Sequence, residues 1–227
     1  MQYQWILFDA DETLFDFDAF NGLKLAFDQF ELEFAEQDFD LFLEVSLPLW
    51  RDYQDGRISS TELQRRRFLH WADKHGLDAE HINSQFILSM AHSSKLLPGA
   101  AELLDTLSGR ATLGIITNGF TQMQQIRLDN NKVSHHFTHL VISEQVGVAK
   151  PHPGIFEHTF QLLGNPPREQ ILMVGDNVHA DVLGGINAGI HTCWLNHHGQ
   201  PRPEGIEPHH EVKDLYELNN LLTRLCR

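Results

Sequence analysis

Cysteine is scarce in this sequence, and long apolar runs and basic N-terminal residues are missing. The 227 residues include two cysteines, Cys193 and Cys226, too few for a disulfide framework and typical of a reducing compartment. No apolar run approaches the roughly 18 residues of a membrane span. Residues 1–4 contain no basic residue and lead directly into an apolar run, so a signal peptide is not expected. We therefore expect a cytoplasmic protein.

Basic residues are also few. There are 17 lysines and arginines against 31 acidic residues, and the formal net charge is -14. This charge argues against nucleic acid polymers and membrane surfaces as main partners, because both carry phosphates that would be repelled. A small phosphorylated substrate stays compatible, since a local cation can reverse the field inside a pocket. The sequence leaves the oligomeric state open.

Short apolar runs alternate with segments of helical pattern, as in a parallel sheet covered by helices. The chain is 41% hydrophobic and 21% charged, which is typical of a globular protein. We therefore predict an α/β fold: a Rossmann-like parallel sheet with helices on both faces. The expected strands are residues 5–8, 112–116, 140–142, 171–174 and 192–195.

One interval lacks strands and has only helical patterning. Apolar residues recur at helical spacing from Phe20 to Phe30, and Ser59 with Glu62 has the spacing of a capping box, which predicts a helix ending near Gly76. A small bundle needs large apolar side chains, so most phenylalanines here are interpreted as core. The predicted domains are residues 1–15 and 99–227 for the Rossmann-like core and residues 16–98 for an inserted all-helical domain.

Two aspartates, Asp9 and Asp11, stand where the first strand ends. Ligands of open α/β sheets bind at the carboxyl edge of the strands. Crowded carboxylates repel each other, so such a pair usually accompanies a bound cation or a shared proton. The alternative is an ordinary acidic turn that caps a helix.

Polar residues follow the later strands in the same way. Thr117 and Asn118 precede a turn-forming glycine, and backbone N–H groups with a hydroxyl in such a turn can bind phosphoryl oxygens. Lys150 precedes a proline, and Asp176 follows a glycine with Asp181 five residues later. Asp181 has an alternative reading as a helix N-cap.

The order Asp-x-Asp, Thr-Asn-Gly, Lys-Pro and Gly-Asp-x4-Asp resembles the haloacid dehalogenase superfamily, over essentially the whole chain. The resemblance implies that the helical interval is a mobile cap and that catalysis passes through an aspartyl phosphate. It also implies the following roles: Asp9 as nucleophile; Asp11 as general acid and then base; Asp9, the carbonyl of Asp11 and Asp176 as Mg2+ ligands; Thr117, Asn118 and Lys150 as phosphate-binding groups; and Asp181 as a residue that orients Lys150 or a metal-bound water.

Two positions refine this resemblance. Aspartate at position 11, where dehalogenases have tyrosine, favours phosphatases or mutases over enzymes that cleave carbon–halogen bonds. Glu12 departs from the pattern, since glycine is common there and would ease an unusual backbone turn. This departure removes no catalytic group.

A closer resemblance concerns the substrate. Residues 9–15, 115–120, 146–151 and 184–189 are similar to the bacterial pyrimidine 5'-nucleotidases, which hydrolyse nucleoside monophosphates such as dUMP, dTMP and UMP. The alternatives are a sugar-phosphate phosphatase or phosphomutase with the same core chemistry, and a catalytically idle binding protein. The last predicts the loss of Asp9, Asp11, Lys150 or Asp176, and all four are present.

Two other features are interpreted as surface. The three pairs of adjacent histidines are not expected to hold zinc, because adjacent residues on an extended chain point apart. Arg65–Arg67 form a basic run that is most often a solvated helix face, and the alternative is a role in holding substrate anions. The histidine pairs are His135–His136, His197–His198 and His209–His210.

Overall fold

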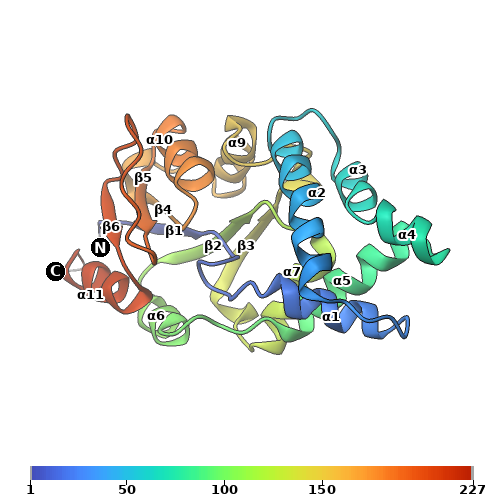
Figure 1. The fold of residues 1–227 in the computed structure, drawn as a ribbon. Coiled ribbons are helices and arrows are strands. Elements are labelled where there is room, and N and C mark those ends of the chain that lie inside the picture. The colour runs from blue at the N-terminus through green and yellow to red at the C-terminus, as the bar shows by residue number, and fades with distance from the viewer. Residues whose placement is uncertain (1, 226–227) are drawn as a thin grey trace. The chain divides into compact units, whose positions relative to one another are not determined.

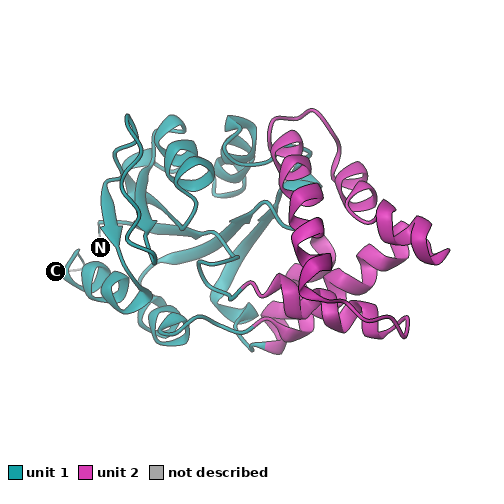
Figure 2. Cartoon of the chain, viewed as in Figure 1, with its two compact units in different colours: residues 1–16, 95–119, 131–227 teal, residues 17–94, 120–130 magenta. Residues whose placement is uncertain are grey.

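The computed structural model describes residues 2–225, so Cys226 lies outside the described residues. The chain forms two compact units (Figure 2). One unit spans residues 1–16, 95–119 and 131–227, and the other spans residues 17–94 and 120–130. Within residues 2–225, every helix is too short or too polar to cross a bilayer.

The first unit is built on a parallel six-stranded sheet in the order β3-β2-β1-β4-β5-β6 (Figure 1). The predicted α/β fold is therefore confirmed. A sixth strand was not predicted, because it is three residues long and follows a proline-rich stretch without an apolar pattern. The strands are β1 (Trp5–Phe8), β2 (Thr112–Thr117), β3 (Phe137–Ile142), β4 (Ile171–Gly175), β5 (His191–Leu195) and β6 (His210–Val212).

Helices cover both faces of this sheet (Figure 1). Phe156 and Phe160 of α9 are fully buried against β1 and β4 residues such as Leu7 and Met173. On the other face, α11 packs beside α6. The helices of this unit are α6 (Ala100–Leu107), α8 (Ser143–Val146), α9 (Pro153–Leu162), α10 (Gly184–Asn187) and α11 (Leu215–Leu225), with a π-helical turn at Val178–Leu183.

The register of the central strands places their carboxyl ends side by side. Phe8 of β1 pairs with Ile115 of β2 and with Val174 of β4. The amide of Asp9 continues this ladder and donates to the carbonyl of Val174 at 2.8 Å. The residues that follow β1, β2 and β4 therefore meet at one edge of the sheet.

The second unit is helical. Its core is aromatic: Phe27, Phe68 and Trp71 are almost fully buried, and the Phe27 and Trp71 ring centroids lie 6.0 Å apart. Its helices are α1 (Ala19–Asp28), α2 (Glu36–Gln54), α3 (Ser60–Arg66), α4 (Leu69–His75), α5 (Ala79–Ser93) and α7 (Thr121–Asn130). Helix α7 packs on α5, although it follows β2 in the chain. Residues 120–130 thus join this unit, outside the predicted range 16–98. The function of this unit as a cap stays a prediction.

The structure of α3 and α4 agrees with the sequence prediction at the start of α3 and differs from it in the number of helices. The Ser59 hydroxyl accepts from the amide of Glu62 at 3.1 Å, so the predicted cap is confirmed. The single predicted helix is instead two helices, and the second of them, α4, is capped by Gly76 in a left-handed conformation. The basic run is also split: Arg65 and Arg66 are exposed, as expected, whereas Arg67 is only 2% exposed.

Candidate active site

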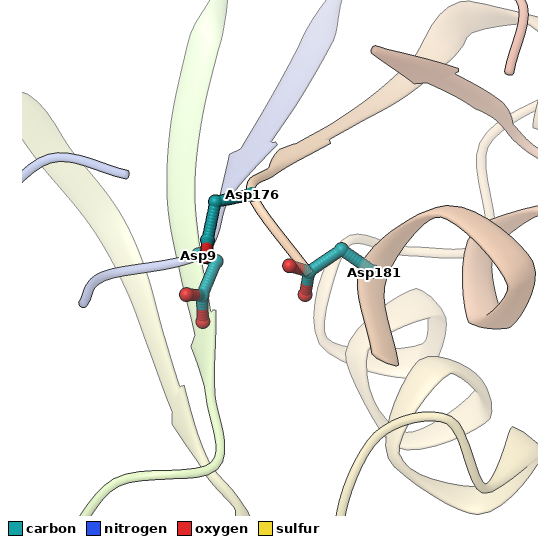
Figure 3. A group of neighbouring side chains, drawn as sticks. All are labelled: Asp9, Asp176 and Asp181. Atoms are coloured by element: carbon teal, nitrogen blue, oxygen red, sulfur yellow. The ribbon is translucent and has the colours of Figure 1, made fainter. Parts of the chain in front are cut away.

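Three carboxylates gather at the carboxyl edge of the sheet. Asp9 follows β1, Asp176 follows β4, and Asp181 points toward them from the π-helical turn (Figure 3). One oxygen from each lies within 4.8 Å of the others. The Asp11 carboxylate is not part of this group. The predicted contribution of Asp11 to metal binding is its backbone carbonyl, not its carboxylate. The structure therefore brings together three of the four predicted aspartates through their side chains.

Lys150 is buried against this group and is only 1% exposed. Its Nζ donates to Oδ1 of Asp9, to Oδ1 of Asp181 and to the carbonyl of Ile116, each at 2.6 Å. An ammonium has three protons to donate, so all are used. These bonds fix the lysine between the end of β2 and two of the carboxylates, with its charge directed inward.

The loop that carries Lys150 is joined to the end of β2 by Asn118. The Asn118 side chain accepts from the amide of Lys150 at 2.7 Å and donates to its carbonyl at 2.9 Å. The hydroxyl of Thr117 accepts from the amide of Gly119 at 3.0 Å, which closes a tight turn. The side chain of Asn118 is thus occupied in holding the loop, and the predicted phosphate contact of this residue is assigned to its backbone N–H.

Asp181 is not a helix cap. Asn177 takes that role, and its Oδ1 accepts from the amides of His179 and Ala180. The second oxygen of Asp181 accepts from the amide of Asn177 at 3.1 Å. Gly175 leaves room for this arrangement, because a Cβ there would lie 2.1 Å from Oδ2 of Asp181.

Two residues that sequence reasoning missed hold Asp176. The Thr13 hydroxyl accepts from the amide of Asp176 at 3.1 Å and donates to its Oδ1 at 3.3 Å. The indole of Trp194 donates to the carbonyl of Asp176 at 2.8 Å. The only signal for Thr13 was a hydroxyl close to the Asp-x-Asp motif, and Trp194 gave none beyond its buried strand.

Burial dominates the electrostatics of the site. It raises the pKa of Asp9 from the ordinary 3.8 to about 7, against the opposing effect of Lys150. Burial and the charge of Asp9 raise the pKa of Asp176 to about 7 as well. The pKa of Asp181 is raised by burial, while that of Lys150 is raised by Asp181 and Asp9, which outweigh its own burial.

These charges fit a divalent metal ion. When all three carboxylates are ionised, one ammonium leaves two negative charges uncompensated in a buried space. A cluster of carboxylate oxygens is the ligand set preferred by Mg2+ and other hard cations. The chemistry of the donors is therefore that of a divalent metal site, which agrees with the sequence prediction in its coarser form.

The loop between Asp9 and Phe15 has an unusual backbone. Glu12 has φ of 55°, in the left-handed region that glycine favours. Its amide donates to the carbonyl of Phe15 at 2.8 Å, and the amides of Leu14 and Phe15 both donate to the carbonyl of Ala10. The turn inferred from the glycine preference at this position is thus present, and the chain makes it with glutamate.

Comparisons with known proteins agree with this geometry. The chain is 48% identical over 224 residues to pyrimidine 5'-nucleotidase YjjG of Escherichia coli (strain K12), covering 99% of this chain and 100% of that protein. It is 33% identical over 231 residues to pyrimidine 5'-nucleotidase PynA of Streptococcus pneumoniae, with 99% and 97% covered. The resemblance to bacterial pyrimidine 5'-nucleotidases is therefore confirmed.

A solved structure has the same fold over the same length. The crystal structure of YfnB from Bacillus subtilis, bound to magnesium and described as revealing interdomain movement, superposes with a TM-score of 0.85 at 28% identity and covers 98% of this chain and 99% of that one. A family model of haloacid dehalogenase-like hydrolases matches residues 3–189. The chain therefore belongs to the haloacid dehalogenase-like hydrolases.

Proposed function

We propose that this hydrolase is a Mg2+-dependent pyrimidine nucleoside 5'-monophosphatase that acts through an aspartyl phosphate on Asp9. The observation that supports the chemistry is the buried Lys150, bonded to Asp9 and Asp181 with Asp176 beside them. The observation that supports the substrate is the full-length similarity to two enzymes named pyrimidine 5'-nucleotidases.

In this proposal the reaction has two steps. A carboxylate oxygen of Asp9 forms a bond to phosphorus as the bond from phosphorus to the 5'-oxygen breaks, and Asp11 gives its proton to that departing oxygen. Asp11 then takes a proton from water, whose oxygen attacks phosphorus and releases phosphate from Asp9. Lys150 stabilises Asp9 in the ionised form that attacks.

Three further groups in the proposal bind the phosphoryl oxygens. These are the Thr117 hydroxyl, the Asn118 N–H and the Lys150 ammonium, which offset the charge on the oxygens during transfer. Asp9, the Asp11 carbonyl and Asp176 would hold Mg2+, which supplies positive charge that the carboxylates and the phosphate share. YfnB, which was crystallised with magnesium, supports this choice of metal. Asp181 keeps Lys150 in place.

The experiment is a panel of phosphate-release assays with Mg2+, using dUMP, dTMP, UMP, purine monophosphates and several sugar phosphates, and Asp9→Asn as the blank. Selective turnover of the pyrimidine monophosphates is the expected result. Preference for sugar phosphates would overturn the substrate and favour the sugar-phosphatase alternative while keeping the chemistry. Silence across the panel would favour a mutase or another ester. The cytoplasmic location stays a prediction.

A further inference from the structure

The segment after β5 lies beside the loop that carries Asp9 and Asp11. Glu12 and Asp176 line one small cavity together with four residues of this segment: Asn196, His197, His198 and Gln200. All of these residues belong to the sheet-containing unit. The proposed chemistry uses Asp176 but none of residues 196–200.

Glu12 has a strained backbone conformation, with φ of 55°. A residue with a Cβ in the left-handed region is strained, and such residues persist where the surrounding structure holds them. Glu12 directly follows Asp11, so a change at its φ angle would move the peptide that carries the Asp11 carbonyl. The conformation of Glu12 thus determines where both the acid and a predicted metal ligand lie.

His197 supplies such support. Its Nε2 lies 2.9 Å from the carbonyl oxygen of Glu12. A carbonyl can only accept, so Nε2 carries the proton and donates it. The ring is half-buried, whereas the next residue, His198, is exposed. The bond joins two residues that are 185 positions apart in the chain.

The backbone around His197 is itself fixed. The Asn196 amide donates to the carbonyl of Val212 at 2.8 Å, which extends the β5–β6 pairing. The Asn196 side chain exchanges two hydrogen bonds with the backbone of Gln200, each at 2.9 Å, and also donates to Glu211 at 2.8 Å. Trp194 is also bonded to the carbonyl of Asp176, so this segment contacts both the loop that carries Glu12 and the loop that carries Asp176.

We propose that His197 is a positioning residue, which holds Glu12 in its left-handed conformation and so aligns Asp11 with the departing 5'-oxygen. The inference rests on the proposed function, since it assigns the proton transfer to Asp11. It predicts that loss of His197 impairs substrates that need a proton on the departing oxygen more than substrates that do not. An alkyl phosphate such as dUMP needs it, whereas p-nitrophenyl phosphate leaves as a stable phenolate.

The test compares kcat/KM, which reports formation of the aspartyl phosphate, for dUMP and p-nitrophenyl phosphate. His197→Ala is expected to lower kcat/KM for dUMP about 10-fold or more, because small misplacements of a catalytic group have effects of this size. The value for p-nitrophenyl phosphate should change by less than about threefold. The matched control is His198→Ala, which should leave both values unchanged, and His197→Gln should recover part of the loss, since its amide also donates.

A second variant tests the role of strain. Glycine adopts the left-handed region at no cost, so Glu12→Gly should make the enzyme less dependent on His197. In that background, His197→Ala should lower kcat/KM for dUMP clearly less than it does in the wild type. Equal losses with glutamate and glycine, equal losses on the two substrates, or no loss with His197→Ala would each overturn the proposal.

One readout is independent of turnover. The Glu12 amide donates to Phe15 inside the loop, so it should exchange its hydrogen faster in His197→Ala and at the wild-type rate in His198→Ala. Unchanged exchange in His197→Ala would also overturn the proposal. If the wild type hydrolyses a sugar phosphate rather than dUMP, the proposed function fails, and the same comparison is made with that alkyl ester.

Discussion

At the scale of single residues, the three carboxylates of the site share one cationic partner among the described residues. The Lys150 ammonium donates to both Asp9 and Asp181. Asp176 is held instead by the Thr13 hydroxyl, which bonds to its amide and its Oδ1, and by the Trp194 indole, which donates to its carbonyl. Asp176 therefore has no lysine of its own at hydrogen-bond distance among the described residues. Its orientation depends on Thr13 and Trp194, two residues without charge.

This predicts an effect of Thr13 on metal affinity. Thr13→Val keeps the shape of the side chain and removes the hydroxyl that bridges the amide and Oδ1 of Asp176. The Mg2+ concentration for half-maximal activity should rise by about 10- to 100-fold, as is common when a group that orients a metal ligand is lost. Thr159→Val is the control, since Thr159 is equally buried but bonds its own helix. An unchanged Mg2+ requirement in Thr13→Val would contradict this assignment.

At the scale of elements, helix α3 shows how one run of arginines divides into two environments. Arg67 packs its guanidinium over Phe86 and Phe120, each with its ring centroid 5.0 Å away, and donates from Nε to Asn83 at 2.9 Å. Burial lowers its pKa to about 9. Arg65, two residues earlier, is exposed.

A conservative substitution should separate the two arginines. Arg67→Lys replaces a planar group by a compact ammonium and loses the stacking and the two-point contact with Asn83. The free energy of unfolding should fall by about 1–3 kcal/mol, whereas Arg65→Lys should change it by less than about 0.5 kcal/mol. Chemical denaturation of both variants measures this. Equal effects would show that the aromatic surroundings of Arg67 contribute nothing to stability.

What the sequence could and could not predict follows from distance along the chain. Asp9, Thr117 and Asp176 could be placed because each follows an apolar run, and parallel strands end at one edge. Lys150, which lies beyond the loop after β3, was identified by its place before a proline in the order of motifs. The contacts of Thr13, Trp194 and His197 could not be predicted. Thr13 and Trp194 bond to the backbone of Asp176, and His197 bonds to the backbone of Glu12, so in each case the partner is a backbone atom that leaves no pattern in the sequence. The packing of helix α7 on α5 was not predicted for the same reason, because it leaves no local pattern in the sequence.

At the scale of the whole molecule, pH, metal and stability are linked through the buried acids. Burial raises the pKa of Asp9 and Asp176 to about 7, so the folded state retains protons that the unfolded state has already lost. The stabilising contribution of these protonated acids is full below about pH 4 and is lost as the pH rises through about 7. Without metal, the folded protein should therefore become less stable over this interval through these two groups.

Mg2+ should reverse that loss. Its carboxylate ligands must be deprotonated to bind it, so the increase in Tm on adding Mg2+ after EDTA treatment should be larger at pH 8 than at pH 5. Asp176→Asn should abolish most of this increase at pH 8. Calorimetry with and without Mg2+ at both pH values measures the effect. An equal increase at the two pH values would contradict a site formed by these acids.

The most direct test of the account is detection of the phosphate on Asp9. The enzyme is quenched during turnover of dUMP with Mg2+ and treated with borohydride, which reduces an aspartyl phosphate to homoserine, and the peptide that contains Asp9 is analysed by mass spectrometry. Homoserine at position 9 is the predicted result, together with no turnover by Asp9→Asn in a protein that keeps its fold. Phosphate release without homoserine at position 9, or turnover by Asp9→Asn, would contradict the covalent mechanism.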